Sequence, residues 1–149
     1  MFYPEFIDLS VALLLGACLG AERSYAGKTA GMRTYGLVSM GSCLFILISR
    51  FAAISSGEVN LDQMRMAAGV IMGIGFLGGG VIVFKDSKVS GLTTAAGLWV
   101  AAGIGMAVGY GYASLATFAT IATLIVFTFF WMIEHVIFRM ENRKNKNDR

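Results

Sequence analysis

The residues that could do chemistry are a short group of charged and hydroxyl side chains at positions 22–34 and one carboxylate further along. Glu22, Arg23, Arg33 and Thr34 form the group, and Asp86 stands between two lysines. Proteins bind Mg²⁺ through one or two carboxylates while the ion keeps several waters, so Glu22 with Asp86 could hold a hydrated Mg²⁺ or dock a partner. The other interpretation is a set of ion pairs and interface anchors.

Other motifs resemble sites of known chemistry but lack residues that such sites need. Gly73–Gly78 spells the dinucleotide-binding motif without a preceding strand or the acidic residue that follows about 20 positions later. Gly27–Thr29 resembles the end of a phosphate-binding loop, but Glu22 occupies the place of its first glycine. Val108–Gly111 resembles a potassium filter without its threonine, and we instead predict a tight turn at Gly109–Tyr112 that joins two antiparallel helices. His135 has no second histidine for a zinc site. Since no nucleophile–base pair can be assembled either, we predict no enzymatic activity.

Five apolar runs must position these residues. Four of the runs contain no Asp, Glu, Lys or Arg, and the first contains only Glu5 and Asp8, near its start. A soluble core needs helices with a polar face toward water, whereas a membrane-spanning helix needs ~20 mainly apolar residues. We therefore predict an all-α integral membrane protein with five transmembrane helices. The runs are Pro4–Ala21, Thr34–Ser49, Met66–Phe84, Gly91–Val108 and Ala113–Ile133.

The positions of the basic residues predict the orientation of the chain. With five spans, the hydrophilic segments alternate between the two sides of the membrane. Arg50 and Arg65 fall on one side together with the N-terminus, and all other lysines and arginines fall on the opposite side. Cytoplasmic loops carry an excess of Lys and Arg. We therefore expect the N-terminus outside and the C-terminus in the cytoplasm.

The composition is that of one small helical bundle in lipid. Hydrophobic residues make up 56% of the chain, and mean hydropathy is +0.70. We expect one five-helix domain at residues 1–138 and a short basic tail at 139–149. The formal charge of +3 is explained by the membrane interface, not by nucleic acid. Cys18 and Cys43 fit no metal or redox spacing.

Glycines at helical spacing predict close helix packing. In lipid, helices associate where small residues let their backbones approach. We expect the first, third and fourth helices to pack tightly, the fifth to face lipid, and a spare glycine face to form a homodimer. The same glycines, with Thr93 and Thr94, could instead line a pore. The glycines that carry these predictions are Gly16, Gly20, Gly73, Gly75, Gly78 and Gly80.

The apolar runs also discriminate between modes of transport. Carriers usually place ionisable groups or broken helices near the membrane midplane. Here no charged residue lies at that depth, which argues against a carboxylate-based or proton-coupled carrier. A channel lined by carbonyls and hydroxyls stays open as an alternative, with Ser39, Ser42, Thr93 and Thr94 as candidates.

Several blocks of the chain, over roughly residues 10–111, resemble the signature of the MgtC/SapB family. That family has a five-span membrane domain, so the resemblance implies the topology reached above. Longer members add a cytoplasmic C-terminal domain, in whose place we expect only the basic tail at 139–149. The blocks are Gly16–Arg23, Gly27–Thr34, Leu37–Gly41, Ala67–Gly80, Gly91–Ala96 and Leu98–Met106.

The resemblance implies a multi-pass protein of the bacterial inner membrane, linked to growth in low Mg²⁺, acid stress and survival inside macrophages. Members are regarded as regulators that restrain a membrane partner, the ATP synthase, and have also been described as magnesium transporters. Our first hypothesis is a non-enzymatic regulator that acts through contacts in the membrane. The second is a channel or transporter for Mg²⁺ or another ion. No resident cofactor is expected beyond the Mg²⁺ of the Glu22–Asp86 hypothesis.

Overall fold

A computed structural model describes residues 4–56, 63–85, 87–133 and 137. Its helices are α1 (Pro4–Tyr25), α2 (Met32–Ser56), α3 (Gln63–Val81), α4 (Leu92–Gly109) and α5 (Ala113–Ile125), which a π-helical turn, η1 (Val126–Phe130), extends. All five helical stretches are long and apolar enough to cross a membrane, which confirms the five predicted spans. Asp86, His135 and the predicted tail at 139–149 lie outside the described residues.

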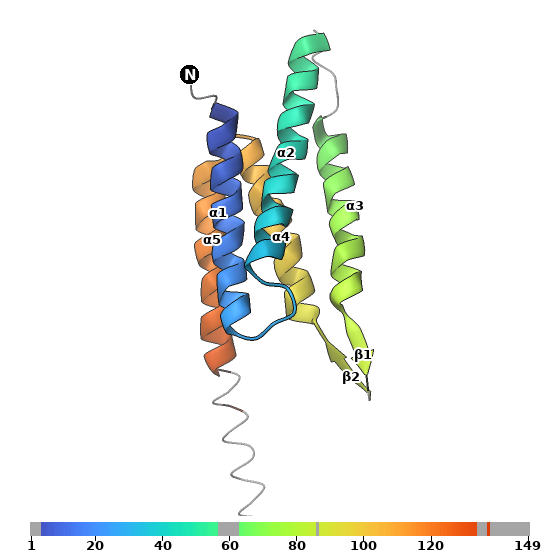
Figure 1. Cartoon of the computed structure of the whole chain (residues 1–149), viewed down its shortest axis with the longest axis vertical. Helices are drawn as coiled ribbons and strands as arrows, with labels where there is room; N and C mark the ends of the chain where they lie inside the picture. Colours follow the sequence, from blue (N-terminus) through green and yellow to red (C-terminus); the bar gives the residue numbers. More distant parts are fainter. Residues whose placement is uncertain (1–3, 57–62, 86, 134–136, 138–149) are drawn as a thin grey trace, which may run out of the picture.

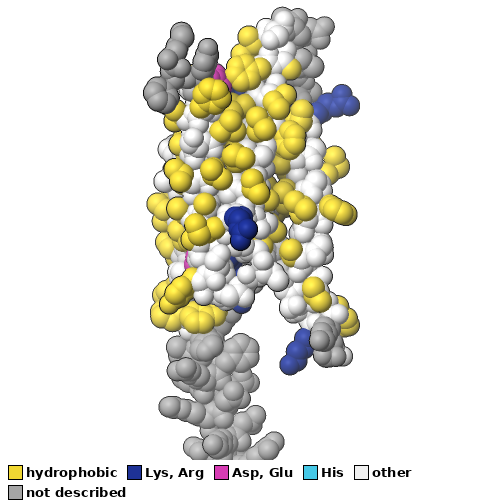
Figure 2. Space-filling view, in the orientation of Figure 1, with side chains coloured by type: hydrophobic (Ala, Val, Ile, Leu, Met, Phe, Trp, Pro, Cys, Tyr) yellow, Lys and Arg dark blue, Asp and Glu magenta, His cyan; other side chains and the backbone are white. Residues whose placement is uncertain are grey.

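The helices form an upright bundle in which α2 packs most extensively, against α1 and against α4 (Figure 1). Their contact buries side chains such as Leu19, Tyr35, Ile46 and Leu98. Most other large apolar side chains lie on the outer surface, where Figure 2 shows them spread over the length of the helices. In water such a surface would cause aggregation, whereas in a bilayer it contacts lipid.

Glycines make the three-helix contact possible. A Cβ at Gly16 would lie 2.5 Å from the Tyr35 carbonyl oxygen and 2.7 Å from the Ser39 Cβ. A Cβ at Gly105 on α4 would overlap with the Ser39 carbonyl oxygen, and one at Gly109 would lie 2.8 Å from the Ile46 Cβ. The backbones of α1 and α4 therefore touch α2 directly, as expected for small residues at membrane helix interfaces.

The position of α3 corrects one expectation. The glycine spacing predicts that the third helix packs tightly against the first and fourth. In the structure α2 takes that place, and α3 lies on the outside against α4 and α2 (Figure 1). A Cβ at Gly73, Gly75 or Gly80 would meet nothing within 4 Å, and one at Gly78 would make an ordinary contact with Ala95 at 3.7 Å. These glycines therefore make no close backbone contact with the neighbouring helices.

A small β-hairpin between α3 and α4 is a second correction, because the amino-acid pattern predicts helices alone. The third apolar run was predicted to continue to Phe84, but α3 ends at Val81. Strands β1 (Val83–Lys85) and β2 (Lys88–Ser90) pair antiparallel beyond the helix end. Valine and phenylalanine favour strands. The end of α3 could not be located from the apolar run, because the end of the helix and the start of β1 are both apolar.

The predicted turn between the fourth and fifth helices is confirmed. Helix α4 ends at Gly109, α5 begins at Ala113, and the two helices contact each other as an antiparallel pair. Gly111 has φ of +86°, and its N–H donates to the Val108 carbonyl at 2.8 Å. The large side chains of α5 point outward, and only Ala116 and Thr120 within it are buried, as expected for a helix that faces lipid.

Candidate functional site

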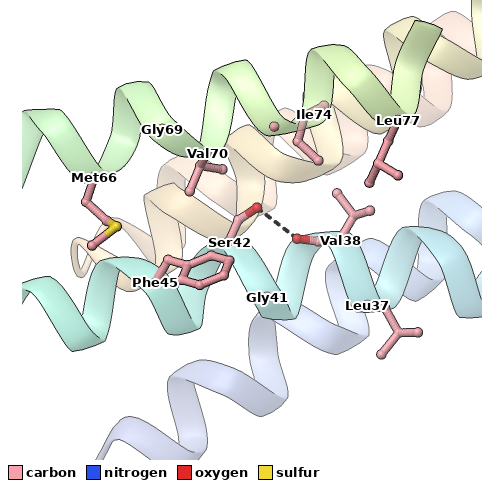
Figure 3. A pocket seen from close by; sticks show the side chains of 11 residues that line it. Leu37, Val38, Gly41, Ser42, Phe45, Met66, Gly69, Val70, Ile74 and Leu77 are labelled. Atoms are coloured by element: carbon pink, nitrogen blue, oxygen red, sulfur yellow. Dashed lines mark hydrogen bonds between the residues drawn. The ribbon is translucent and has the colours of Figure 1, made fainter. Parts of the chain in front are cut away.

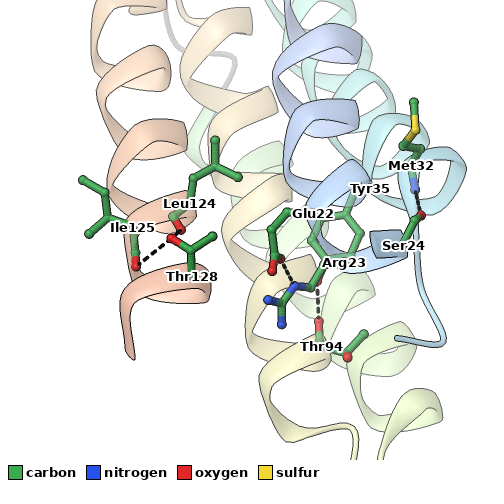
Figure 4. A network of polar contacts seen from close by, with 9 residues as sticks. All are labelled: Glu22, Arg23, Ser24, Met32, Tyr35, Thr94, Leu124, Ile125 and Thr128. Atoms are coloured by element: carbon green, nitrogen blue, oxygen red, sulfur yellow. Dashed lines mark hydrogen bonds and ion pairs between the residues drawn. The ribbon is translucent and has the colours of Figure 1, made fainter. Parts of the chain in front are cut away.

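The most elaborate polar arrangement among the described residues lies where α1 ends and α2 and α4 begin, which we call the basic end of the bundle. Arg23, in the last turn of α1, is buried with 3% of its surface exposed. Its Nε donates a short hydrogen bond to the carboxylate of Glu22 (Figure 4). A buried charge is costly unless it is paired, so the carboxylate compensates the guanidinium.

An aromatic ring covers the same guanidinium. The Arg23 Cζ lies 3.7 Å from the centre of the Phe127 ring, which is buried with 6% exposed. A cation over an aromatic face is attracted by the ring quadrupole, and more strongly where water is excluded. Phe127 belongs to the π-helical turn η1, whose Thr128 hydroxyl donates to the Leu124 carbonyl at 2.8 Å. Short π-helical turns occur frequently at functional sites.

A tyrosine ties the second and fourth helices together beside this pair. The hydroxyl of Tyr35 donates to the Thr94 carbonyl at 3.2 Å, and both residues are buried (Figure 4). Gly97, one turn further along α4, leaves room for the two rings. A Cβ there would overlap with the Tyr35 hydroxyl and lie 2.7 Å from the Phe127 Cζ. The basic end is therefore one packed cluster built from α1, α2, α4 and η1.

The short connection from α1 to α2 holds this cluster in place. The Lys28 N–H donates to the Arg23 carbonyl at 2.9 Å, and Gly27 has φ of +67°, a left-handed helix end that glycine favours. The Ser24 hydroxyl then accepts a hydrogen bond from the Met32 N–H at 3.3 Å. Because the loop is closed at both of its ends, Glu22 and Arg23 are held against the start of α2.

The predicted site residues separate into three groups. Glu22, Arg23 and Thr94 come together in the cluster, whereas Arg33, Thr34 and Thr93 are exposed. Asp86 lies outside the described residues, so the predicted Glu22–Asp86 pair for Mg²⁺ stays a prediction. Within the described ranges, no three His, Cys, Asp or Glu side chains lie close enough together to hold a metal.

Three members of the cluster are not among the site residues predicted from the sequence: Tyr35, Gly97 and Phe127. Each stands in an apolar run, where a tyrosine, a glycine or a phenylalanine is ordinary. The available signal was Arg23 itself, because a charge at the end of a spanning helix needs a partner. The sequence does not say which of the many aromatic residues provides it.

A second arginine acts at the opposite end of the bundle. Arg50, in the second half of α2, donates from Nη1 to the Gly109 carbonyl at the end of α4, at 2.8 Å. A cation at the C-terminus of a helix satisfies a free carbonyl and the negative end of the helix dipole. The α2–α4 contact is thus joined by hydrogen bonds at both ends.

The polar contacts at the basic end can hold the helices in fixed positions relative to one another. The Arg23 guanidinium is held by a carboxylate and a ring, and the Tyr35 hydroxyl is held by a backbone carbonyl. These contacts keep charged and polar groups in fixed positions at the edge of the membrane helices. They make the cluster suited to setting the relative positions of four helical segments.

Comparison with known proteins agrees with the membrane architecture. Over 96 residues the chain is 43% identical to a protein of Escherichia coli K12 with the name "Putative magnesium transporter YhiD", covering 62% of this chain and 45% of that protein. It is 44% identical over 96 residues to the protein MgtC of Salmonella typhimurium LT2, covering 64% of this chain and 39% of the relative. A Haemophilus influenzae protein is 39% identical over 105 residues.

The matched region spans less than half the length of each of these relatives. No solved structure matches the chain. The MgtC family model covers residues 9–136, a range that includes the three-helix contact, the hairpin and the cluster at the basic end. The chain is therefore a multi-pass membrane protein and belongs to the MgtC family.

Proposed function

We propose that this protein is a non-enzymatic regulator of the bacterial inner membrane, which supports adaptation to low magnesium or acid stress by binding another membrane protein through its helices. The observation that carries the proposal is an apolar groove between α2 and α3, lined by glycines at which a Cβ would meet nothing within 4 Å. Members of the same family include MgtC and a protein named as a magnesium transporter, so two functions must be weighed.

The binding surface lies between α2 and α3. A cavity of about 560 Å³ separates the two helices, and its lining is almost entirely apolar (Figure 3). The one hydroxyl in the lining, that of Ser42, donates to the Val38 carbonyl at 2.8 Å and so makes its bond within α2. The other lining residues are Leu37, Gly41, Phe45, Met66, Gly69, Val70, Gly73, Ile74 and Leu77.

The occupant that fits this groove best is a transmembrane helix. Gly41, Gly69 and Gly73 line it, and a Cβ at any of them would meet nothing within 4 Å. Gly69 and Gly73 are one turn apart, the spacing at which small residues allow a second helix to approach. We take α3 of a second copy as the first candidate, since a homodimer presents the same face twice. A helix of a different membrane protein is the other candidate.

Disulfide cross-linking tests the groove. In a chain with Cys18→Ser and Cys43→Ser, Gly73→Cys is compared with Phe118→Cys, a matched control on the outward face of α5. We expect Gly73→Cys to form a disulfide-linked dimer in membranes, or a mixed disulfide with a membrane protein, and Phe118→Cys to form neither. Equal cross-linking at both positions, or none at Gly73→Cys, contradicts the proposal.

Transport of Mg²⁺ or another ion is the alternative, favoured by the name of the Escherichia coli relative. The buried Ser39 and Thr94 place hydroxyls inside the bundle. Against a pore through the bundle, the backbones of α1 and α4 are in contact with Ser39 at Gly16 and Gly105. Purified protein in vesicles with a Mg²⁺-sensitive dye discriminates the two functions: selective, saturable uptake supports transport and contradicts a purely regulatory role.

A further inference from the structure

The β-hairpin is an unusual element for a membrane bundle. It continues from the end of α3 and leads into α4, and it splays away from α5 at the basic end (Figure 1). Its register pairs Phe84 with Val89 and Lys85 with Lys88. One cross-strand pair is therefore apolar and the next is basic, with Asp86 and Ser87 between the two lysines along the chain.

The apolar side chains of the hairpin are uncovered. Phe84 is 74% exposed, Val83 52% and Val89 49%, and Leu92 at the start of α4 is 58% exposed. In water these side chains would form an exposed apolar patch, which soluble surfaces rarely keep without a partner. In the hydrocarbon core, a two-stranded hairpin would leave the outer N–H and C=O groups of both strands without hydrogen bonds. At the interface between lipid and water, the apolar side chains contact lipid while the outer backbone groups of the strands form hydrogen bonds with water.

The charges of the hairpin point to the same location. The register sets Lys88 opposite Lys85, and like charges directly opposite each other destabilise a strand pair, so an external anion would stabilise the hairpin. The hairpin lies at the end of the bundle that also carries Arg23, Lys28 and Arg33, which we predict to be cytoplasmic. Anionic lipids of that leaflet attract basic residues close to its surface.

The base of the hairpin fixes its direction. Gly91 has φ of +88°, and a Cβ there would overlap with the Val81 carbonyl oxygen at the end of α3. The Ser90 hydroxyl donates to the Val83 carbonyl at 3.3 Å, across the two strands. Because the ends of the hairpin are held together against α3, its apolar pair is presented to one fixed depth relative to the helices.

We propose that the hairpin Val83–Ser90 is an interfacial anchor that binds the headgroups of anionic phospholipids. Phe84 and Val89 enter the boundary between headgroups and acyl chains, and Lys88 meets the lipid phosphates. Amphipathic elements with aromatic and aliphatic residues on one part and lysines on another bind membranes in this way. The proposal does not depend on the regulatory function or on what fills the α2–α3 groove.

The test uses a tryptophan in the hairpin of the full chain. Trp99→Phe and Trp131→Phe remove the native tryptophans, and Phe84→Trp introduces a reporter. The protein is reconstituted into phosphatidylcholine vesicles with or without phosphatidylglycerol, each also prepared with lipids brominated near the headgroup. We expect the reporter emission to shift to shorter wavelength and to be quenched several-fold more by brominated lipid when phosphatidylglycerol is present.

Two variants make the result specific. Lys85→Gln with Lys88→Gln should remove the dependence on phosphatidylglycerol, and Phe118→Trp on α5 should be insensitive to the headgroup. Circular dichroism checks that each variant is folded. A reporter that emits as in water, or that is quenched equally with both lipids, overturns the proposal. So does a blue-shifted reporter that brominated lipid does not quench, because a protein strand would then cover the hairpin.

Discussion

The contact of α1, α2 and α4 and the groove between α2 and α3 are both rich in glycine, yet the glycines act differently in the two regions. At Gly16 and Gly105 a Cβ would overlap with, or press against, the neighbouring backbone. At Gly69 and Gly73 a Cβ would meet nothing. Gly16 and Gly105 therefore serve helix packing within the chain, whereas Gly69 and Gly73 are accessible to the helix of another protein molecule. The two regions should therefore respond differently to the same substitution.

The largest effect is expected in the three-helix contact. Gly105→Ala places a methyl group on the Ser39 carbonyl oxygen, and a backbone atom can move away only if two helices separate. We expect a loss of about 3 kcal/mol in the free energy of unfolding, at the upper end for overpacked cores. Unfolding in mixed detergent, followed by circular dichroism, measures it. Stability equal to the unchanged chain would show that this contact is looser than described.

Arg23→Met should have the next largest effect. The substitution keeps an unbranched apolar stem but removes the guanidinium, which leaves the Glu22 side chain, 17% exposed, without its cation. Breaking a buried pair costs 3–5 kcal/mol, and the partial exposure of Glu22 reduces our expectation to about 2 kcal/mol. The double variant Glu22→Gln/Arg23→Met should recover part of the loss. If the loss in the free energy of unfolding of the double variant equals the sum of the losses for Glu22→Gln and Arg23→Met alone, the ion pair contributes nothing.

Tyr35→Phe should have a smaller effect. It removes the hydroxyl that donates to the Thr94 carbonyl while both rings of the cluster stay in place. A hydrogen bond of this kind contributes about 1 kcal/mol to stability. The matched control is Tyr112→Phe, in the exposed turn before α5, which should leave the unfolding curve unchanged. Equal effects at the two positions would contradict the role of Tyr35 in joining α2 to α4.

The smallest effect on stability is expected in the groove. Gly73→Ala meets open space, and alanine favours a helix over glycine by about 1 kcal/mol, so the monomer should be unchanged or slightly more stable. Its association should nevertheless weaken, since a methyl group keeps a second helix at a greater distance. Energy transfer between labelled copies in vesicles measures association. A Gly73→Ala variant that associates normally while Gly105→Ala does not would reverse the comparison.

Much of the architecture could be predicted from the amino-acid sequence, because a bilayer constrains it directly. The apolar runs located all five helices, and Gly109–Tyr112 located the turn between the last two. The position of α3 could not be predicted, since Gly73 and Gly16 have the same spacing pattern and differ only in what lies opposite. The hairpin was missed because Val83 and Phe84 continue the apolar run of α3.

The site was predicted in part. Glu22 and Arg23 were selected as charged residues beside the first loop, with an ion pair as one of two interpretations, and the structure pairs them with each other. Which ring covers Arg23 depends on the turn η1, and no local pattern in the sequence distinguishes Phe127 from Phe129 or Phe130. The position of a side chain around a helix axis is decided by tertiary packing, which is why the cluster appeared only with the fold.

The two hydrogen bonds between α2 and α4 have a mechanical consequence. Tyr35 and Arg50 lie fifteen residues apart on α2, or about 22 Å at the rise of an α-helix, and each is bonded to an end of α4. Two hydrogen bonds this far apart oppose sliding and rotation of α2 relative to α4, so the two helices form one frame. Helix α3 packs on the outside of that frame, against both of its helices. Any widening of the groove between α2 and α3 must therefore displace α3 and leave the α2–α4 pair in place.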